Sequence, residues 1–237
     1  MQSYGVSLTP AFLSDATADF VLGRESGTSA QWSFLLGIPF SFAPGGESGQ
    51  TSTLTVARFV QEWLDRRLNQ VVAARSTFSI GLDAFGATIH GFEPDGRFVA
   101  WLGQFQWARR FGERDYQMIF KSNLQLANDP LLPMEKCALG GMDTVRGYPE
   151  NTLVRDECFI ASLEFRMPVY QLPLAGVSRA SNEGRVQLAA FTDYGYARTR
   201  GQFNLEPNSI YSAGLGIRWD RARDPCGAVL GLPLYGR

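Results

Sequence analysis

The residue best placed for specific chemistry is Arg146, in the stretch Gly140-Gly141-Met142-Asp143-Thr144-Val145-Arg146-Gly147-Tyr148. An arginine carries a permanent charge and a planar fork of N–H donors that suits a carboxylate. Because glycine tolerates positive φ and close backbone approach, three glycines in this stretch predict a shaped loop. One candidate partner is Asp193, in the stretch Phe191-Thr192-Asp193-Tyr194-Gly195. A loop arginine opposite a strand aspartate indicates a docked loop rather than a catalytic pair.

The chain offers few side chains for catalysis or metal binding. Hydrolysis needs a nucleophile oriented by a base, and the only histidine, His90, lies in an expected loop beside Gly91. The three cysteines, Cys137, Cys158 and Cys226, are too few and too scattered for a metal site or a disulfide framework. Cys137 and Cys158 could pair in an oxidising compartment, but we expect free thiols. We therefore expect no enzyme, no metal and no cofactor.

Composition narrows the class of protein. Of the 237 residues, 45% are hydrophobic and only 19% are charged, where about a quarter is usual for a soluble domain. No run of about 18 apolar residues exists, which excludes a transmembrane helix. A transmembrane β-barrel fits this composition because lipid-facing and lumen-facing residues alternate and cancel in the average, although a large β-sandwich shares some of these traits. The net charge of −1 and the lack of a basic block give no reason to expect nucleic-acid binding.

Alternating polar and apolar residues predict the elements that must position Arg146 and Asp193. About ten strands are expected by this period, at about residues 3–12, 15–25, 52–65, 71–88, 97–110, 115–127, 159–167, 185–198, 209–219 and 226–236. The loop between the strands that end near 127 and begin near 159 contains Arg146 and is called the central loop. Residues 26–51 are expected to be mostly loop, with an eleventh strand interrupted by Pro39 as the alternative.

The lengths of these segments favour a membrane barrel over a sandwich. Several reach ten residues or more, and a membrane-spanning strand needs about 9–11 residues, whereas sandwich strands have about 5–6. The apolar face of the pattern ends in aromatic residues such as Tyr116, Tyr196, Tyr211 and Trp219, as an interfacial girdle would. Long and short connections also alternate, as expected of external loops and periplasmic turns. The sequence therefore predicts an all-β fold, an antiparallel transmembrane β-barrel whose polar face lines the lumen.

The motifs of the chain resemble those of a known superfamily. Gly140-Gly141-x-x-x-Val145-Arg146-Gly147-Tyr148, followed by Asp156 and by Ser162-Leu163-Glu164-Phe165-Arg166, resembles the signature of the outer-membrane translocons that include BamA. The resemblance is closest to the haemolysin secretion/activation branch (ShlB, FhaC and HecB), the TpsB transporters of two-partner secretion. Phe191-x-Asp193-x-Gly195 resembles the second barrel motif of that family. The resemblance covers essentially the whole chain.

The resemblance implies roles for particular residues. In that family a barrel of about sixteen strands follows periplasmic POTRA domains, and the arginine loop folds inward into the lumen. Carried onto this chain, the resemblance implies that Arg146 meets Asp193 inside the barrel, with Glu164 as a nearby lumen acid. The other members of the two motifs are expected to shape the loop and its docking strand: Gly140, Gly141, Val145, Gly147 and Tyr148 in the loop, and Phe191 and Gly195 in the strand.

The chain also departs from the family pattern. It shows about ten strands rather than sixteen, and neither a POTRA-like pattern nor the family's last strand is visible. We therefore expect residues 1–237 to form the C-terminal part of a transmembrane β-barrel domain, an incomplete barrel with a long inward-folding loop. In addition, Cys158 stands where the family usually has glycine.

The function implied by the resemblance is polypeptide transport across the outer membrane of a Gram-negative-type bacterium. The expected partners are a secreted polypeptide, which would cross unfolded, and outer-membrane lipid. Two alternatives stay open: an outer-membrane protein assembly factor of the BamA type, and a passive pore. The feature that separates them is the upstream sequence, because POTRA domains imply polypeptide handling.

Overall fold

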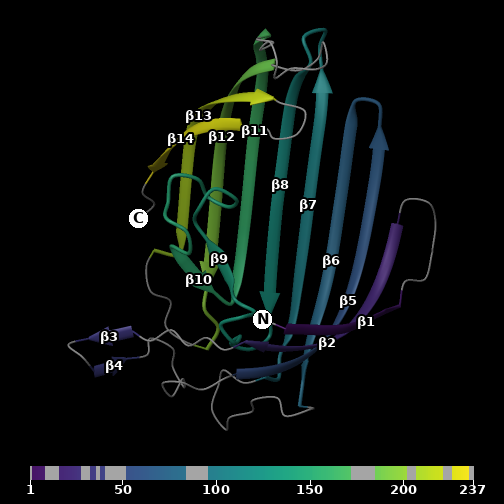
Figure 1. Ribbon diagram of the computed structural model, residues 1–237, viewed down its shortest axis with the longest axis vertical. Coiled ribbons are helices and arrows are strands. Elements are labelled where there is room, and N and C mark those ends of the chain that lie inside the picture. The colour runs from purple at the N-terminus through teal and green to yellow at the C-terminus, as the bar shows by residue number, and fades with distance from the viewer. Residues whose placement is uncertain are drawn as a thin grey trace.

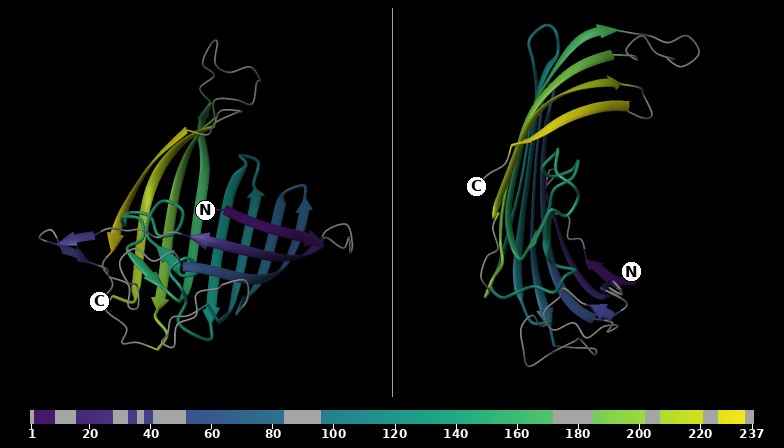
Figure 2. Two further views of the ribbon diagram at one scale, coloured as in Figure 1. Left: turned by 60° about the horizontal axis from the view of Figure 1, so that its bottom comes forward. Right: turned by 90° about the vertical axis from the view of Figure 1, so that its left-hand side faces the viewer.

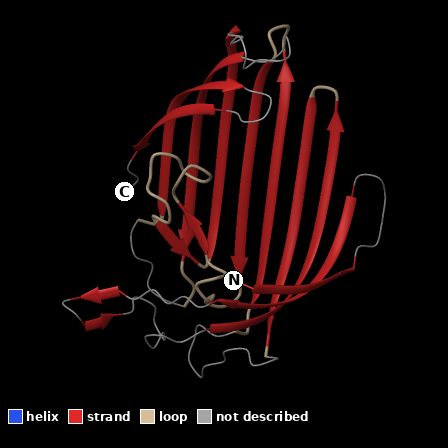
Figure 3. Ribbon diagram, in the orientation of Figure 1, coloured by secondary structure: helices blue, strands red, loops and turns tan. Residues whose placement is uncertain are grey.

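A computed structural model describes residues 2–8, 16–27, 33–35, 38–40, 52–83, 96–171, 185–201, 207–220 and 226–234. Side chains are described from 55 to 83, 96 to 170, 185 to 201 and 207 to 218. These residues form strands, turns and loops, without a helix (Figure 3). In particular, this part of the chain contains no helix long and apolar enough to cross a membrane.

Ten strands form one antiparallel sheet in the order β1-β2-β5-β6-β7-β8-β11-β12-β13-β14 (Figure 1). Their bounds are β1 Gln2–Leu8, β2 Ala16–Gly27, β5 Ser52–Arg67, β6 Gln70–Leu82, β7 Val99–Phe111, β8 Tyr116–Ala127, β11 Glu157–Gln171, β12 Arg185–Arg198, β13 Ser209–Asp220 and β14 Cys226–Leu234. Each strand pairs with the next sheet strand along the chain, so the topology is a simple meander. The ten strands expected from the alternation are therefore confirmed. Of the predicted strand residues, 9–12, 15, 84–88 and 235–236 lie outside the described residues, as does His90.

Residues around Pro39 do not form an eleventh strand of the sheet. Two short strands, β3 Ser33–Leu35 and β4 Ile38–Phe40, pair only with each other, with Ser33 opposite Phe40. The alternative of one strand interrupted by Pro39 is therefore wrong.

The sheet is strongly curved, and the central loop lies on its concave side (Figure 2). This loop, residues 128–156, connects β8 to β11 and contains its own small two-stranded sheet, β9 Cys137–Leu139 and β10 Leu153–Arg155. The connections at the opposite end of the sheet between β5 and β6 and between β7 and β8 are short turns. The curvature and the antiparallel pairing give an incomplete barrel, as the sequence predicted.

The two faces of the sheet have the reverse of the polarity that water favours. On β12, Gln187 and Asp193 are each only 1% exposed on the concave face, while Leu188, Tyr194 and Tyr196 are exposed on the convex face. A sandwich in water would bury its apolar face and expose the polar one. A wall that faces hydrocarbon does the opposite, with lipid covering the apolar side chains. This inversion decides between the two fold classes that alternation alone left open.

Two clusters of buried apolar residues on the concave face include residues of the central loop. One cluster joins the start of the loop to β5, β7 and β8, and a second joins the middle of the loop to β11, β12 and β13. The first contains Val56, Phe98, Ala100, Ala127, Leu131 and Leu132, and the second contains Leu139, Val145, Leu153, Cys158, Ile160, Ala197 and Ile210. The loop is therefore packed against the wall along much of its length.

Candidate functional site: the docked central loop

The guanidinium of Arg146 makes a two-pronged ion pair with Asp193. Arg146 Nε lies 2.7 Å from Asp193 Oδ2, and Arg146 Nη2 lies 2.7 Å from Asp193 Oδ1. The backbone N–H of Arg146 also donates to Asp193 Oδ2, at 3.1 Å. Both residues are buried, since Arg146 is 8% exposed and Asp193 is 1% exposed. One strand carboxylate therefore binds the backbone and the side chain of the loop tip together.

Glu164 on β11 is the second acid of the site and forms ion pairs with three arginines. It accepts from Arg146 Nη1 at 2.5 Å and from Arg166 Nε at 2.7 Å. Arg218 Nε, on β13, lies 3.1 Å from Glu164 Oε1, but this contact lacks hydrogen-bond geometry, and Arg218 Nη2 reaches Glu164 Oε2 at 3.4 Å. If the loop leaves the wall, Glu164 keeps two cations, whereas Asp193 loses Arg146.

A neighbouring hydroxyl and an aromatic ring complete the binding of the arginine. Ser162 Oγ donates to Asp193 Oδ1 at 2.7 Å and accepts from Arg146 Nη2 at 3.1 Å. The guanidinium lies over the ring of Phe191, with Cζ 3.6 Å from the ring centroid, as in a cation–π contact. Burial lowers the pKa of Arg146, but its hydrogen bonds to Asp193 and Glu164 outweigh this and raise the pKa above its usual value. Arg146 is therefore held as a charged cation with four side-chain hydrogen bonds.

The three residues of the strand motif lie on one face of β12 and have different contacts. Residues 191, 193 and 195 alternate along the strand and therefore point to the same concave face. The ring face of Phe191 packs against the guanidinium of Arg146, and Asp193 binds that guanidinium, as described above. At Gly195, a Cβ atom would lie 2.7 Å from Leu139 Cδ2 and 2.9 Å from Val145 Cγ2. Gly195 thus leaves the space in which Val145, fully buried, packs against the wall.

Gly195→Ala should lift the loop from the wall without changing any charge. The added methyl overlaps side chains of two buried residues, Leu139 and Val145, and overpacking of this kind costs about 1–3 kcal/mol. We expect faster cleavage of the central loop by thermolysin in the folded protein. Gly214→Ala, at a half-buried glycine of β13, is the control. Equal cleavage rates for both variants and the wild type would contradict the packing role assigned to Gly195.

The glycines of the loop motif occupy conformations that other residues rarely adopt. Gly140, Gly141 and Gly147 have φ values of 106°, 96° and 91°. A Cβ at Gly140 would lie 2.2 Å from Pro149 O, so this position also requires close backbone approach. The N–H of Gly141 donates to Tyr148 O at 3.1 Å, which closes the tip of the loop on itself. Tyr148 Oη in turn donates to Tyr211 O on β13 at 3.3 Å.

Cys137 and Cys158 are joined in a disulfide, so the expectation of free thiols was wrong. Their Cα atoms are 6.4 Å apart, within the usual range for a bridge of about 4.4–6.8 Å. The bridge connects β9 of the loop to β11 of the wall. Cys158 is 4% exposed and lies in a regular strand position opposite Gln125 and Ala197. The spacing of the two cysteines in the sequence did not predict this bridge. Whether they meet depends on how β9 and β11 are aligned in the folded protein.

Reduction of the disulfide should lower the free energy of unfolding of the loop region by about 3 kcal/mol. This is the chain-entropy estimate for a bridge that closes a loop of about twenty residues. The double variant Cys137→Ser/Cys158→Ser should lower the temperature at which the folded protein loses heat-modifiable migration in gels. Dithiothreitol should have the same effect on the wild type and none on the double variant. Cys226→Ser serves as the control thiol. A double variant as stable as the wild type would show that the bridge does not stabilise the loop.

A second acidic network, which the sequence reasoning did not assign, holds both ends of the central loop. Asp156, 0% exposed, accepts from the backbone N–H of Leu131 at 3.0 Å and of Arg200 at 2.8 Å. The ammonium of Lys136 lies 3.3 Å from the same carboxylate. Next to it, buried Glu157 pairs with Arg198 and Arg200 from the end of β12. One carboxylate thus joins the start of the loop, its end and the segment after β12.

The only signal for this network in the sequence was the position of Asp156 in the motif that follows Arg146. Its contacts come from residues 25 and 44 positions away, which no local pattern relates. Within the described part of the chain, no group of histidine, cysteine, aspartate or glutamate residues could hold a metal ion. The site is therefore an ion-paired docking surface: its residues can fix or release a loop.

Comparisons with known proteins give the chain a family and a fold. The model of the haemolysin secretion/activation protein ShlB/FhaC/HecB family matches residues 48–219. No curated protein sequence matches the chain. Among solved structures, CdiB from Escherichia coli is similar over 98% of this chain and 41% of its own, with a TM-score of 0.72 and 18% identity.

Two further structures agree. CdiB from Acinetobacter baumannii matches with a TM-score of 0.66 and 15% identity, over 98% of this chain and 38% of its own. BamA from Haemophilus ducreyi lacking POTRA domains 1–3 matches with a TM-score of 0.69 and 14% identity, over 99% of this chain and 51% of its own. At these identities the likeness is one of fold. The chain spans about two fifths of the length of the CdiB structures and half of the BamA structure.

Proposed function

The chain belongs to the haemolysin secretion/activation protein ShlB/FhaC/HecB family of outer-membrane β-barrel proteins, and from that membership we propose that it acts in two-partner secretion. The proposed activity is export of an unfolded partner polypeptide through the barrel, across the outer membrane of a Gram-negative bacterium. The family is one of secretion proteins rather than of enzymes. Residues 1–237 would supply part of the barrel wall and the loop that occupies its interior.

The observation that carries the proposal is the binding of Arg146 by Asp193, Glu164 and Ser162 on the polar concave wall. A loop held there by paired charges fills space that an unfolded chain would need. Paired charges suit a reversible contact better than an apolar seal does. A polypeptide brings its own polar groups into the lumen and can replace the contacts of the loop as it passes.

The charges that remain after release support this reading. Once Arg146 leaves, Glu164 is still paired with Arg166 and Arg218, and Asp193 still accepts from Ser162. The wall would then carry two arginines and two carboxylates in this region, with no net excess of either sign. Such a surface neither traps nor repels a passing chain strongly, because long-range charge is absent.

The experiment compares secretion and conductance in the same full-length protein. The complete reading frame is expressed with its export signal and with a partner polypeptide encoded beside it, as wild type, Arg146→Ala and Arg146→Lys. We expect Arg146→Ala to fold into a heat-modifiable barrel, to secrete less and to change single-channel conductance in planar bilayers. Because lysine lacks the planar fork, Arg146→Lys should recover only part of the secretion.

A protein that folds, conducts and never secretes any partner would instead favour a passive pore. The similarity in fold to BamA favours a second candidate, an assembly factor that inserts other outer-membrane proteins. This candidate makes a different prediction. Depletion of the protein would lower the amounts of unrelated barrels in the outer membrane, whereas depletion of a secretion transporter would affect the exported partner alone.

The prediction that residues 1–237 are the C-terminal part of a longer barrel domain is retained as a proposal. It is supported by the share of the CdiB structures that the chain covers, 41% and 38%. Outer-membrane lipid is the other proposed partner, in contact with the convex apolar face.

A further inference from the structure

Release of the central loop leaves one carboxylate of the wall without a cation. In the docked state Asp193 binds Arg146 through both of its oxygens, while Glu164 binds Arg146 and two further arginines. Of the contacts that the structure describes, Asp193 then retains only the hydroxyl of Ser162. A carboxylate that loses its cation in a partly desolvated place is destabilised. A second cation that reaches Asp193 would therefore make the loop easier to open.

The strand register identifies one such cation, Lys121 on β8. Cross-strand pairs form a row on the concave face that runs through Asp193. In this row Ser162 on β11 is paired with Asp193, and Lys121 is paired with Ser162. The row continues with Gln106 on β7 and with Ser212 on β13. From β7 to β13, Lys121 and Asp193 are thus the only charged residues of the row.

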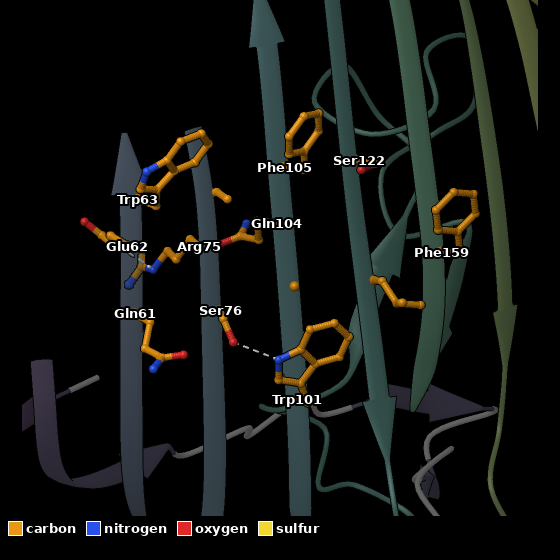
Figure 4. A pocket seen from close by; sticks show the side chains of 13 residues that line it. Gln61, Glu62, Trp63, Arg75, Ser76, Trp101, Gln104, Phe105, Ser122 and Phe159 are labelled. Atoms are coloured by element: carbon orange, nitrogen blue, oxygen red, sulfur yellow. Dashed lines mark hydrogen bonds and ion pairs between the residues drawn. The ribbon is translucent and has the colours of Figure 1, made fainter. Parts of the chain in front are cut away.

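Lys121 lies on the concave face, beside the docked loop. The next residue, Ser122, is on the convex face, because Ala161 pairs with both Ser122 and the exposed convex residue Tyr194. Ser122 and Phe105 line a groove on that convex face (Figure 4). Neighbouring residues of a strand point to opposite faces. The side chain of Lys121 is exposed, and within the described part of the chain its ammonium makes no hydrogen bond or ion pair.

The spacing of Lys121 and Asp193 suits an ion pair once the loop has left. Neighbouring strands lie about 4.7–4.9 Å apart, so the Cα atoms of these two residues are separated by roughly 10 Å. The ammonium stands on a long, flexible stem, the intervening residue, Ser162, is small, and side chains converge on the concave side of a curved sheet (Figure 2). In the docked state Arg146 Nη2 fills this place, since it donates to Ser162 Oγ at 3.1 Å and to Asp193 Oδ1 at 2.7 Å.

Two other cations of the concave wall are less well placed to reach Asp193. Arg75 on β6 is paired with Glu62 at 3.3 Å (Figure 4), and β6 is four strands away from β12 in the sheet. Arg166 is held by Glu164, and it lies four residues along β11 from the row of Asp193, a distance of roughly 13 Å. Each of these arginines would also have to leave a carboxylate of its own.

We propose that Lys121 replaces Arg146 as the cation bound to Asp193 when the central loop leaves the wall, and that it stabilises this open state. The inference rests on the proposed function for its role in transport, and it adds the residue that acts once the loop has opened. Lys121 is a positioning residue, because it acts on the loop through Asp193. Arg146 and Lys121 compete for one carboxylate, so the loop opens without leaving that buried charge unpaired.

The test measures how often the loop opens in the purified full-length protein, without a partner polypeptide. The backbone N–H of Arg146 donates to Asp193 in the docked state, so its hydrogen exchange follows the population of the undocked loop. The proteins compared are the wild type, Lys121→Gln, Lys121→Arg and Arg110→Gln. Arg110 is the matched control, because it is another exposed cation of the concave face. It is paired with Gln117, four residues along β8 from Lys121.

We expect exchange at the Arg146 amide to be about fivefold slower in Lys121→Gln, because the open state loses one partly exposed ion pair. Lys121→Arg keeps the positive charge and should exchange like the wild type, as should Arg110→Gln. Unchanged exchange in Lys121→Gln would overturn the proposal. Faster exchange would overturn it as well, because that is the effect of removing a residue that supports the docked loop.

A second measurement detects the new ion pair directly. A water-soluble carbodiimide activates a carboxylate, and an amine in contact with it then forms an amide bond. In Arg146→Ala we expect an amide crosslink between Lys121 and Asp193, detected by mass spectrometry of the digested protein, and much less of it in the wild type. Arg146→Ala/Lys121→Arg is the control, because a guanidinium does not react. No crosslink in Arg146→Ala, or one from Lys121 to Glu164 in place of Asp193, would contradict the proposal.

Both measurements use the transporter alone, so their outcome is separate from the outcome of the secretion experiment. Slower exchange in Lys121→Gln together with a wild type that secretes no partner would refute the transport proposal and support the role of Lys121. Secretion by the wild type together with unchanged exchange in Lys121→Gln would do the reverse.

Discussion

Asp193→Ala is expected to release the central loop from the barrel wall, at a cost in docking free energy of about 3–5 kcal/mol. The substitution removes the acceptor of both prongs of the guanidinium and of the backbone N–H of Arg146. Arg146 would keep Glu164 and Ser162, but its Nε and its backbone amide would be buried without an acceptor. Charges left buried without compensation are the most destabilising outcome for an ion pair.

The measurement is the rate at which thermolysin cleaves the central loop in the folded protein. When opening is fast, this rate follows the population of the undocked loop, and about 1.4 kcal/mol corresponds to a tenfold change. The double variant Arg146→Ala/Asp193→Ala should be much less destabilised than the sum of the single variants. Additive effects would show that the two residues are not energetically coupled.

Glu164→Gln provides the contrast within the same site. Arg146 would keep its two-pronged pair with Asp193, so the loop should stay docked more firmly than in Asp193→Ala. The change would mainly affect Arg166 and Arg218, which also contact Glu164. If Glu164→Gln released the loop as strongly as Asp193→Ala, the claim that Asp193 contributes more than Glu164 to loop docking would be refuted.

Asp156→Ala should destabilise the loop-side end of the barrel by a similar amount, about 3–5 kcal/mol. The carboxylate is fully buried and accepts from two backbone amides, those of Leu131 and Arg200, with Lys136 beside it. Each buried donor left without an acceptor costs about 1–3 kcal/mol. Because these donors come from the first part of the loop and from the segment after β12, the variant should loosen both together.

The readout for Asp156→Ala is the urea concentration at which the barrel unfolds, together with hydrogen exchange at the amides of Leu131 and Arg200. Asp156→Asn keeps one acceptor oxygen and should lose less. Asp143→Ala is the matched control, because Asp143 is an exposed carboxylate of the same loop, and surface changes usually stay within about 0.5 kcal/mol. Faster exchange at Leu131 without a change at Arg200 would show that Asp156 does not connect the two segments.

The strands were predictable because alternation is a property of neighbouring residues. A strand in a wall with one polar and one apolar face places neighbouring residues such as Gln187 and Leu188 on opposite faces. The alternation of polar and apolar residues in the sequence therefore reveals the strand. The inward-folding loop was predictable for a different reason, the family motif around Arg146. Alternation did not identify which face meets lipid; the buried Gln187 and the exposed Leu188 of the structure do.

The contacts that depend on register could not be read from the sequence. The disulfide forms because β9 lies beside β11 at the point where Cys158 points inward. The Asp156 network needs the ends of the loop to meet the segment after β12. Similarly, the hairpin of β3 and β4 was missed because six alternating apolar residues, interrupted by Gly37 and Pro39, are compatible with either one strand or two.

The disulfide also limits how far the tip of the central loop can travel. Cys137 and Cys158 are 21 residues apart and close the motif into a covalent ring, with Arg146 near its middle. A chain extends at most about 3.3–3.6 Å per residue, so the shorter arm, from Cys137 to Arg146, reaches roughly 30 Å from the bridge when fully extended. The disulfide therefore keeps an undocked tip within a limited distance of β11. From there the tip can rebind Asp193 without a long diffusional search after each opening.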